Sequence, residues 1–336
     1  MPVSVTCVGI MVVDFIAADL QKVSAPGEVT FTPVGMHIGG HAANVSIDLL
    51  KLGLKRGEVS SVGGVGEDLL GDFVERNLNS FGVVTHLIRT RKAETSKDLI
   101  LVVRGEDRRF HFDVGANLYL DPEFVKGVLK SEKPHIFYGG AVGLLGEFDE
   151  KLLDVLKMAK ELGCLTFLDP IRPYSKGWEF LVGAAPLIDI FHCNNLEAAE
   201  ITGKKELRGA VKELANLGVK MAVVSMGDKG LVAAYEEEIY SMPAFKVDAV
   251  DPTGAGDAFC AGFIKKLLDL KGKTLKEEIK LDQNQLLEVL AYGEAAGAVC
   301  VTAPGTTTAV DKVKVEELLK EQGEKVLSKV KKVKKY

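Results

Sequence analysis

The feature that most constrains the fold of this chain is a regular alternation between two kinds of segment. Short runs rich in β-branched residues, such as residues 3–10 and 165–169, alternate with longer stretches of helical periodicity, such as residues 147–162. Gly82 and Gly163 directly follow two helical stretches, where glycine readily takes the left-handed conformation that ends a helix. Strands alternating with helices predict an α/β domain with a mostly parallel sheet covered on both faces. Ligands in such sheets bind beyond the carboxyl ends of the strands.

The composition disfavours several classes of protein. Hydrophobic residues make up 47% of the chain and the formal net charge is −5, which excludes a disordered chain and disfavours a nucleic-acid binder held by basic charge. No run of about 18 apolar residues occurs, so no membrane-spanning helix is expected. The five cysteines include no CxxC pair and the six histidines are scattered, which predicts free thiols in a cytoplasmic protein and no zinc site.

Two segments break the alternation and predict a small accessory sheet. Residues 12–36 hold short apolar fragments separated by Pro26, Gly27 and Pro33, and residues 98–113 read as two strands around a polar turn. Hairpins outside a doubly wound core suggest a β-sheet lid, built from segments near 12–36 and 95–116. A flap with a purely structural role is the alternative interpretation.

The most informative segment is 251–259, which reads DPTGAGDAF. Gly254, Ala255 and Gly256 predict a tight turn that opens an apolar helix and leaves its first N–H groups bare as an anion site. Asp257 stands at the helix start, where a lone carboxylate is often only a cap. A second carboxylate begins the segment, and this pairing favours a functional interpretation. An anion cradle beside a carboxylate suits phosphoryl transfer to an alcohol, because the carboxylate can take the hydroxyl proton.

Several other segments belong to the same pattern. Residues 39–44 read GGHAAN and open a helix, and residues 194–197 read NNLE. Together with segment 251–259, they resemble the signature motifs of the ribokinase-like (PfkB) family of carbohydrate and nucleoside kinases. Further matches lie at residues 63–71, 225–230 and 301–305, in family order. The resemblance implies a kinase domain over residues 1–311 with a ribokinase-like three-layer α/β fold, a mostly parallel central sheet and a small β-sheet lid.

The resemblance also implies a role for each matching residue. Asp257 would be the catalytic base, and the backbone amides of Gly254, Ala255 and Gly256 would form the anion hole. The sugar would be held by Asp14, Gly39, Gly40 and Asn44, and the nucleotide by Asn194, Ser225, Gly227 and Gly230. Glu197 would hold Mg²⁺, through water because this ion gives up its water shell reluctantly. Many relatives bind a monovalent cation such as K⁺, and the matching positions here are Asp251, Thr253, Cys300, Ala303 and Gly305.

The implied function is ATP-dependent, magnesium-assisted transfer of the γ-phosphate to a hydroxyl of a small carbohydrate of the ribose, fructose or ketodeoxygluconate type. Two alternatives stay open: a nucleoside kinase of the adenosine, cytidine or inosine type, and a sugar-binding protein that has lost catalysis. A mere binding protein would not need Asp257, so an enzyme is favoured. The resemblance also implies a homodimer that associates through the lid, with no nucleic-acid or membrane partner.

Some residues depart from the family pattern or have a role that the pattern does not define. Glu294 stands where relatives often place Asn or His near the adenine, so the nucleotide preference is open. His41 fills a position that varies with the substrate, and a helix-start residue with no ligand role is an equally good interpretation. The arginines that flank the predicted lid turn fit either an acidic or phosphorylated substrate or a solvated hairpin; they are Arg104, Arg108 and Arg109.

The C-terminal segment 312–336 is not explained by the resemblance. It carries 9 Lys against 4 Glu, a local charge of +5 (9 − 4) within a chain of net charge −5. Apolar residues between the lysines predict an amphipathic helix. Such a helix fits either a membrane or RNA contact or a solvated terminal helix that packs one stripe on the core.

Overall fold

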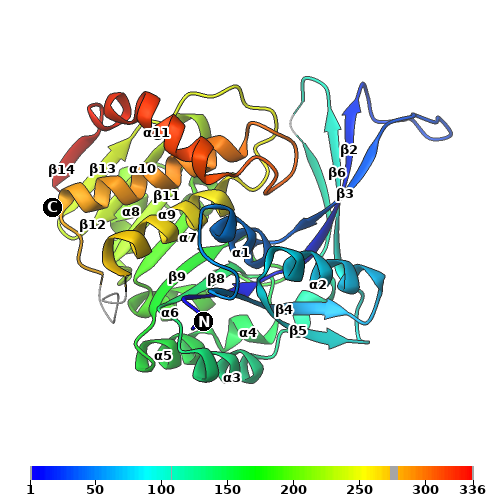
Figure 1. Ribbon diagram of the computed structural model, residues 1–336, viewed down its shortest axis with the longest axis horizontal. Coiled ribbons are helices and arrows are strands. Elements are labelled where there is room, and N and C mark those ends of the chain that lie inside the picture. Colours follow the sequence, from blue (N-terminus) through cyan, green and yellow to red (C-terminus); the bar gives the residue numbers. More distant parts are fainter. Residues whose placement is uncertain (1, 107, 273–278, 335–336) are drawn as a thin grey trace.

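The computed structural model describes residues 2–106, 108–272 and 279–334, so residue 107 of the predicted lid and residues 335–336 of the predicted tail lie outside the described residues. The centre of the molecule is a ten-stranded sheet (Figure 1). Its strands, in spatial order, are β14 (Lys331–Lys334), β13 (Glu238–Met242), β12 (Leu231–Tyr235), β11 (Met221–Ser225), β10 (Ile190–Asn194), β9 (Leu165–Pro170), β8 (Ile136–Val142), β1 (Val5–Gly9), β4 (Val59–Gly66) and β5 (Val84–Thr90).

The sheet is mostly parallel, as the alternation predicts. Every neighbouring pair from β11 to β5 is parallel, and Val5 of β1 stands opposite Ile136 of β8 on one side and Val59 of β4 on the other. Strands β12, β13 and β14 add an antiparallel edge. A parallel pair needs a crossover connection, so the carboxyl ends of the parallel strands gather at one edge.

Helices cover both faces of the sheet because side chains along each strand alternate between two cores. In β11, Met221 and Val223 enter one core, whereas Ala222 and Val224 enter the other. The first core includes apolar residues of α1 (His41–Lys51), α2 (Leu69–Phe81), α9 (Ala255–Lys271), α10 (Gln283–Cys300) and α11 (Lys312–Leu327). The second includes residues of α3 (Pro122–Glu132), α4 (Glu147–Glu150), α5 (Leu152–Glu161), α6 (Glu179–Ala184), α7 (Asn195–Thr202) and α8 (Leu207–Asn216).

Short 3₁₀ helices complete the elements: η1 (Gly115–Tyr119), η2 (Ala185–Leu187) and η3 (Gly227–Lys229). The helix predicted over residues 147–162 is interrupted at Lys151, where α4 gives way to α5. Lys151 is the N-cap of α5 but makes no side-chain cap bond. Lysine is not a typical capping residue, so the sequence did not indicate a helix start at this position. None of the helices in the described ranges is long and apolar enough to cross a bilayer.

A second, four-stranded sheet stands apart from the main body at the right of Figure 1. Its order is β3 (Val34–Gly39), β2 (Val12–Leu20), β6 (Ser96–Val103) and β7 (Arg109–Asp113). The two strands read around a turn in residues 98–113 are β6 and β7, paired antiparallel. The expected combination of a large, mostly parallel sheet and a small separate sheet is therefore confirmed. That the small sheet acts as a lid stays a prediction.

The lysine-rich C-terminal segment packs on the main body through its apolar residues. Val315, Leu318 and Val326 of α11 are buried in the first core. After the helix the chain forms β14, which pairs antiparallel with β13 at the edge of the large sheet. This strand was not expected from the sequence, because its four residues, KKVK, are too few and too polar to show a strand pattern. A lysine-rich edge strand discourages pairing with other chains.

Candidate active site

The turn before α9 has the geometry of an anion site. Gly254, the residue before the helix, has a φ of 80° and a ψ of 0°, and a Cβ there would lie 2.5 Å from the carbonyl oxygen of Thr306. Only glycine meets both conditions without strain. Within the described ranges, the N–H groups of Gly254, Gly256 and Asp257 have no acceptor, whereas the N–H of Ala255 donates to the Pro252 carbonyl at 3.4 Å. The bare donors at this helix start are therefore the N–H groups of Gly254, Gly256 and Asp257, whereas the N–H of Ala255 is already engaged.

Asp257 lies in the first turn of α9 with its carboxylate buried. Its Oδ2 accepts a hydrogen bond of 2.8 Å from Asn44 Nδ2, and its Oδ1 has no hydrogen-bond partner among the described residues. The Nε2 atom of His41 lies 4.0 Å from that Oδ1. Burial raises the pKa of Asp257 although the charge of His41 opposes the rise. A buried carboxylate oxygen without a partner, beside bare N–H groups, can accept a proton from an alcohol bound there.

Asn44 connects Asp257 to the rest of the site. Its Oδ1 accepts a hydrogen bond of 2.9 Å from the hydroxyl of Thr306, and its Nδ2 donates to Asp257. Asn44 and Asp257 are 213 residues apart in the chain, and α1 packs against α9 to bring them together. The resemblance places Asn44 among the sugar-binding residues, whereas in the structure both ends of its side chain hold protein groups. Its contact with Asp257 makes it a positioning residue.

Asp14 is a second buried carboxylate that faces Asp257. It lies on β2 opposite Asp98 of β6, so both side chains share one face of the small sheet. Asp98 accepts a hydrogen bond of 3.1 Å from the N–H of His111, whereas Asp14 has no such partner within the described ranges. Burial, followed by repulsion from Asp98 and Asp257, raises the pKa of Asp14 to about 7. An acceptor left without a donor is suited to bind sugar hydroxyls.

The glycine pair before α1 is explained by contacts within the protein. A Cβ at Gly39 would clash with the Asp14 carboxylate, and a Cβ at Gly40 would clash with the carbonyl oxygen of Ile10. Gly40 also has a φ of 96°, which other residues rarely adopt. The close backbone approach that the sequence associates with a ligand is therefore made to Asp14 and the end of β1.

A buried cluster next to the start of α9 was missed by sequence analysis. The Asp169 carboxylate, at the end of β9, contacts the Nδ1 atom of His192 at 3.0 Å and accepts hydrogen bonds from the hydroxyl of Tyr138 and the thiol of Cys260. Burial opposes ionisation of Asp169, but the charge of His192 and its hydrogen bond lower the pKa. The His192 ring stacks on Phe259 of α9 at 4.8 Å. His192 and Cys260 are 23 and 91 residues from Asp169, so no local pattern marks the cluster.

The NxxE element forms a helix cap. Asn194 precedes α7, and its side chain accepts bonds of 2.9 Å from the N–H groups of Leu196 and Glu197. The Glu197 carboxylate accepts a bond of 2.9 Å from the Asn194 N–H, which completes a capping box. Burial raises the pKa of Glu197 to about 7 even though this hydrogen bond opposes the rise. The Asn194 side chain is thus committed to the cap, and Glu197 keeps one oxygen for a metal or its water.

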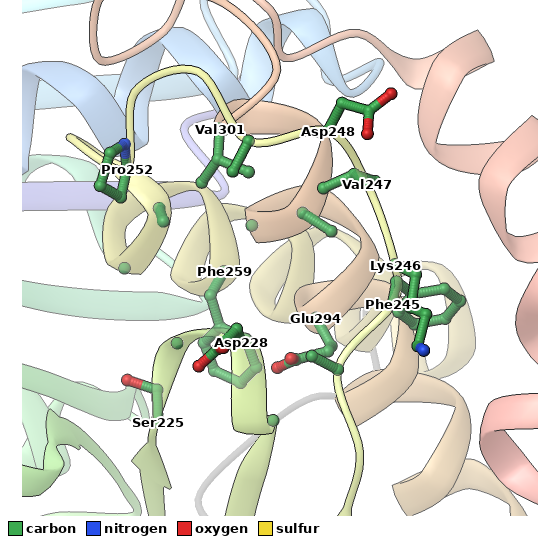
Figure 2. Close-up of a pocket in the computed structure, with 18 residues that line it drawn as sticks. Ser225, Asp228, Phe245, Lys246, Val247, Asp248, Pro252, Phe259, Glu294 and Val301 are labelled. Carbon is green, nitrogen blue, oxygen red and sulfur yellow. The ribbon is translucent and has the colours of Figure 1, made fainter. Parts of the chain in front are cut away.

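A cavity of about 860 Å³ opens next to the anion site (Figure 2). Three of the four residues expected to bind the nucleotide line it: Ser225, Gly227 and Gly230, whereas Asn194 does not. Gly256 and Phe259 form part of its wall, so the cavity is continuous with the start of α9. Its size suits a ligand larger than a simple sugar.

The residues matched to a monovalent cation site surround Asp251. Its carboxylate accepts hydrogen bonds from the N–H groups of Thr253 and Gly305, both at 3.0 Å. The Arg108 guanidinium, from the small sheet, contacts both Asp251, at 3.2 Å, and the Thr253 hydroxyl. Burial opposes ionisation of Asp251, but these hydrogen bonds and the charge of Arg108 lower the pKa.

The remaining members of that set lie close by. The Cys300 thiol contacts the carbonyl oxygens of Thr253 and Thr306 at 3.5 and 3.2 Å. Ala303 lies half-buried in the loop after α10, against the first core.

The three arginines that flank the turn of the hairpin differ in their surroundings. Arg108 reaches the main body, whereas Arg104 pairs with Asp19, and Arg109 pairs with Glu106, in solvent.

Comparisons with known proteins agree with this architecture. The model of the pfkB family of carbohydrate kinases matches residues 3–313. Probable fructokinase-5 of Arabidopsis thaliana is 30% identical over 314 residues, which cover 90% of this chain and 92% of the relative. Aminoimidazole riboside kinase of Salmonella typhimurium is 29% identical over 283 residues, which cover 81% of this chain and 84% of the relative.

Solved structures share the fold. Ribokinase from Giardia lamblia superposes with a TM-score of 0.84 at 21% identity, covering 96% of this chain and 99% of that chain. A fructokinase with bound ATP from Xylella fastidiosa superposes with a TM-score of 0.80 at 23% identity, covering 95% and 99%. The family match spans nearly the whole chain and includes the turn before α9, the GGHAAN helix start, the small sheet and every strand of the large sheet except β14. The chain therefore belongs to the pfkB family of carbohydrate kinases, phosphotransferases that act on a sugar hydroxyl.

Proposed function

We propose that this protein is an ATP-dependent, magnesium-assisted kinase of a small neutral sugar, with Asp257 as the general base. The observation that carries the proposal is the buried Oδ1 of Asp257, which has no hydrogen-bond partner among the described residues. It adjoins the bare N–H groups of Gly256 and Asp257 at a helix N-terminus. A buried acceptor without a donor is costly unless a ligand supplies the missing hydrogen bond. A sugar hydroxyl supplies it here.

The reaction follows from this arrangement. A hydroxyl bound at Asp257 Oδ1 is oriented toward the anion turn, where the helix dipole and the N–H groups stabilise the negative charge of the transferred phosphoryl group. The carboxylate takes the hydroxyl proton as the oxygen attacks phosphorus. The raised pKa of Asp257 favours this step, because a more basic carboxylate holds the proton more readily.

The charges around the sugar position favour a neutral substrate over a sugar acid. Asp14 and Asp98 share the sheet face there, and Asp257 adds a third carboxylate. Among the described residues of the hairpin, Arg108 alone brings a guanidinium to this region, and that guanidinium is bound to Asp251. An acidic substrate would meet like charges at close range, which disfavours binding. The ketodeoxygluconate type is therefore the least favoured of the sugar classes.

A riboside kinase is the second candidate. The aminoimidazole riboside kinase of Salmonella typhimurium is 29% identical to this chain and covers 81% of it. A riboside presents the same hydroxyls as a free sugar, and these hydroxyls would meet Asp14 and Asp257 in the same way. The two candidates differ in whether a base occupies the space beyond the ribose.

ATP and Mg²⁺ are proposed as cofactors. The cavity beside the anion turn would hold ATP, lined by Ser225, Gly227 and Gly230. The residues near the phosphates fit Mg²⁺, because Glu197 keeps one carboxylate oxygen outside the capping box. Burial raises the pKa of Glu197, and a bound cation would favour its ionised form. Mg²⁺ would neutralise phosphate charge there. A monovalent cation near Asp251 stays a prediction. The guanidinium of Arg108 already supplies positive charge there, because it contacts Asp251 and Thr253.

A cytoplasmic homodimer is likewise proposed. The face of the small sheet opposite Asp14 and Asp98 exposes apolar side chains that a second copy of the chain could cover. They are Val34, Met36 and Leu99, which are 61%, 45% and 45% exposed.

Two measurements test the proposed function. A thermal-shift panel of neutral sugars, sugar acids and ribosides identifies the substrate class, because a ligand raises the melting temperature of the state that binds it. ADP release is then measured with the best ligand. Asp257→Asn is expected to lower kcat by at least about 10²-fold while sugar affinity changes little.

The matched control is Asp269→Asn, an exposed carboxylate on the same helix that pairs with Lys265. This variant should retain wild-type turnover. Near-wild-type turnover of Asp257→Asn would contradict the assignment of Asp257 as the general base. Stabilisation by sugar acids alone would overturn the choice of a neutral substrate.

A further inference from the structure

The cavity beside the anion turn contains one partly buried carboxyl group that the proposed mechanism does not use. Glu294 projects from α10 into this cavity (Figure 2). Within the described ranges its side chain has neither a hydrogen bond nor an ion pair. Much of the wall around it is apolar, including Phe259 of α9, Ala298 of α10 and Phe245 of the loop after β13.

The charged groups that line the cavity leave Glu294 without a counterion. They are Asp228 of η3 and Lys246 and Asp248 of the loop after β13, and all three side chains are exposed to solvent. Helix α9 contributes only Ala255, Gly256 and Phe259 to the wall, and α10 adds Gly297 and Ala298. Burial alone, with no charged neighbour contributing, raises the pKa of Glu294 to about 8. The carboxyl group is thus mostly protonated at neutral pH.

The carboxyl group of Glu294, which has no protein partner among the described residues, is hydrated through the open cavity. A ligand that fills the cavity would remove the remaining water and would have to supply the missing hydrogen bonds. The ribose and phosphates of a nucleotide belong toward the anion turn, near Gly256. Glu294, on the helix across the cavity, is then left to meet the base.

We propose that Glu294 reads the hydrogen-bonding edge of the nucleobase, and that its protonation state sets the preference between adenine and guanine nucleotides. This proposal rests on the proposed function, which places the nucleotide in this cavity. A protonated carboxyl group offers one donor and one acceptor, the same pair that the amides of Asn and Gln offer when they bind N6 and N7 of adenine. An ionised carboxylate offers acceptors only, which match the adjacent N1–H and N2–H donors of guanine.

The direction of the pH effect follows from this chemistry. Below the pKa of Glu294 the protonated group favours adenine. Above it, the carboxylate leaves the acceptor nitrogen of adenine facing a negative charge, and guanine gains a second hydrogen bond. A matched base edge discriminates between bases by about tenfold or more. The ratio of the ADP affinity to the GDP affinity should therefore fall by about tenfold or more across the titration.

The test measures binding directly, so it does not depend on knowing the sugar. The Kd values of ADP and GDP are determined by calorimetry between about pH 6.5 and pH 9, on either side of the pKa of Glu294. The diphosphates of the two nucleotides titrate alike, so their effect cancels in the ratio. In the wild type the ratio Kd(GDP)/Kd(ADP) should fall as the pH rises.

Two variants and a control sharpen the result. Glu294→Gln keeps a donor and an acceptor at every pH, so it should prefer ADP with a ratio that does not change. Glu294→Leu should bind both nucleotides with a ratio near one. Glu288→Gln, on the same helix but paired with Lys266 outside the cavity, should keep the wild-type pH dependence.

The outcomes separate the inference from the function on which it rests. A wild-type ratio that is flat with pH, or a Glu294→Gln variant that keeps the wild-type slope, overturns the role of Glu294 while nucleotide binding stands. Failure of the wild type to bind either nucleotide would overturn both this inference and the proposed function. Loss of all binding in Glu294→Leu is checked against its melting temperature. A folded variant that binds neither ADP nor GDP contradicts a role confined to selecting the base.

Discussion

Removal of the Asn44 amide should change the pH at which the enzyme becomes active. Asn44 is 2% exposed, and its Nδ2 donates a hydrogen bond of 2.8 Å to Asp257 Oδ2. This bond stabilises the ionised carboxylate more than the protonated one, so it lowers a pKa that burial raises. A hydrogen bond to a charged group contributes about 1.5–3 kcal/mol. Since 1.36 kcal/mol corresponds to about one pKa unit, Asn44→Ala should raise the pKa of Asp257 by about one to two units.

The assay is the pH dependence of kcat/KM, whose acidic limb reports the ionisation of the general base in the free enzyme. The base must be ionised to take a proton, so a higher pKa moves the acidic limb to higher pH by about one to two units. Above that limb Asn44→Ala should recover much of its activity. Thr306→Val is the matched control, because it removes the donor to Asn44 Oδ1 but leaves the bond from Asn44 to Asp257. Its acidic limb should move by less than about half a unit.

One outcome would refute this reasoning. If Asn44→Ala lowers kcat/KM by the same factor at every pH and its acidic limb stays in place, Asn44 does not act through the ionisation of Asp257. A rise in the KM of the sugar with no shift of the limb would return Asn44 to the sugar-binding role implied by the resemblance.

Three further predictions concern other parts of the site. The pKa of Asp14 is raised to about 7 in the folded state, so between about pH 4 and pH 7 the folded protein holds a proton that the unfolded chain has lost. Ionisation of Asp14 therefore lowers the stability of the fold as the pH rises through this range. Asp14→Asn should raise the melting temperature of the ligand-free protein at pH 8, and this gain should be absent near pH 4. Arg108→Ala should raise the KM of the sugar more than it lowers kcat, because Arg108 ties the small sheet to Asp251, whereas Arg104→Ala, which removes an exposed pair with Asp19, should match the wild type in the same steady-state assay. Gly254→Ala, at a φ of 80° and against the Thr306 carbonyl, should lose most turnover while circular dichroism stays native.

The fold could be predicted well where a pattern repeats over many residues. The alternation of strands and helices predicted a parallel sheet, and the interior strands appear within a few residues of the predicted ranges. Strand β14 and the break between α4 and α5 could not be predicted in this way. β14 depends on pairing with β13, about ninety residues earlier in the chain, and such partners leave no mark on the four residues of the strand itself.

The site was predictable where its residues are neighbours in the sequence. Gly254, Gly256 and Asp257 stand together, so the turn, the helix start and the carboxylate beside it could be read from one segment. The engagement of the Ala255 N–H by Pro252 could not, because it depends on the detailed path of the turn. The cluster around Asp169 also left no signal, since its members come from four separate elements.

The sequence by itself determined which chemical groups this chain brings to a phosphoryl transfer: a bare helix start, a carboxylate within it, and acidic and amide side chains near the carboxyl ends of parallel strands. Only the tertiary structure decided what each group does. Asn44 reaches Asp257 across 213 residues, Asp14 stands opposite Asp98 on a neighbouring strand, and Arg108 bridges the small sheet and the main body. The physical reason is that a pKa or a hydrogen bond depends on distances of a few ångström. Those distances are set by the packing of α1 on α9 and of β2 beside β6, and not by spacing along the chain.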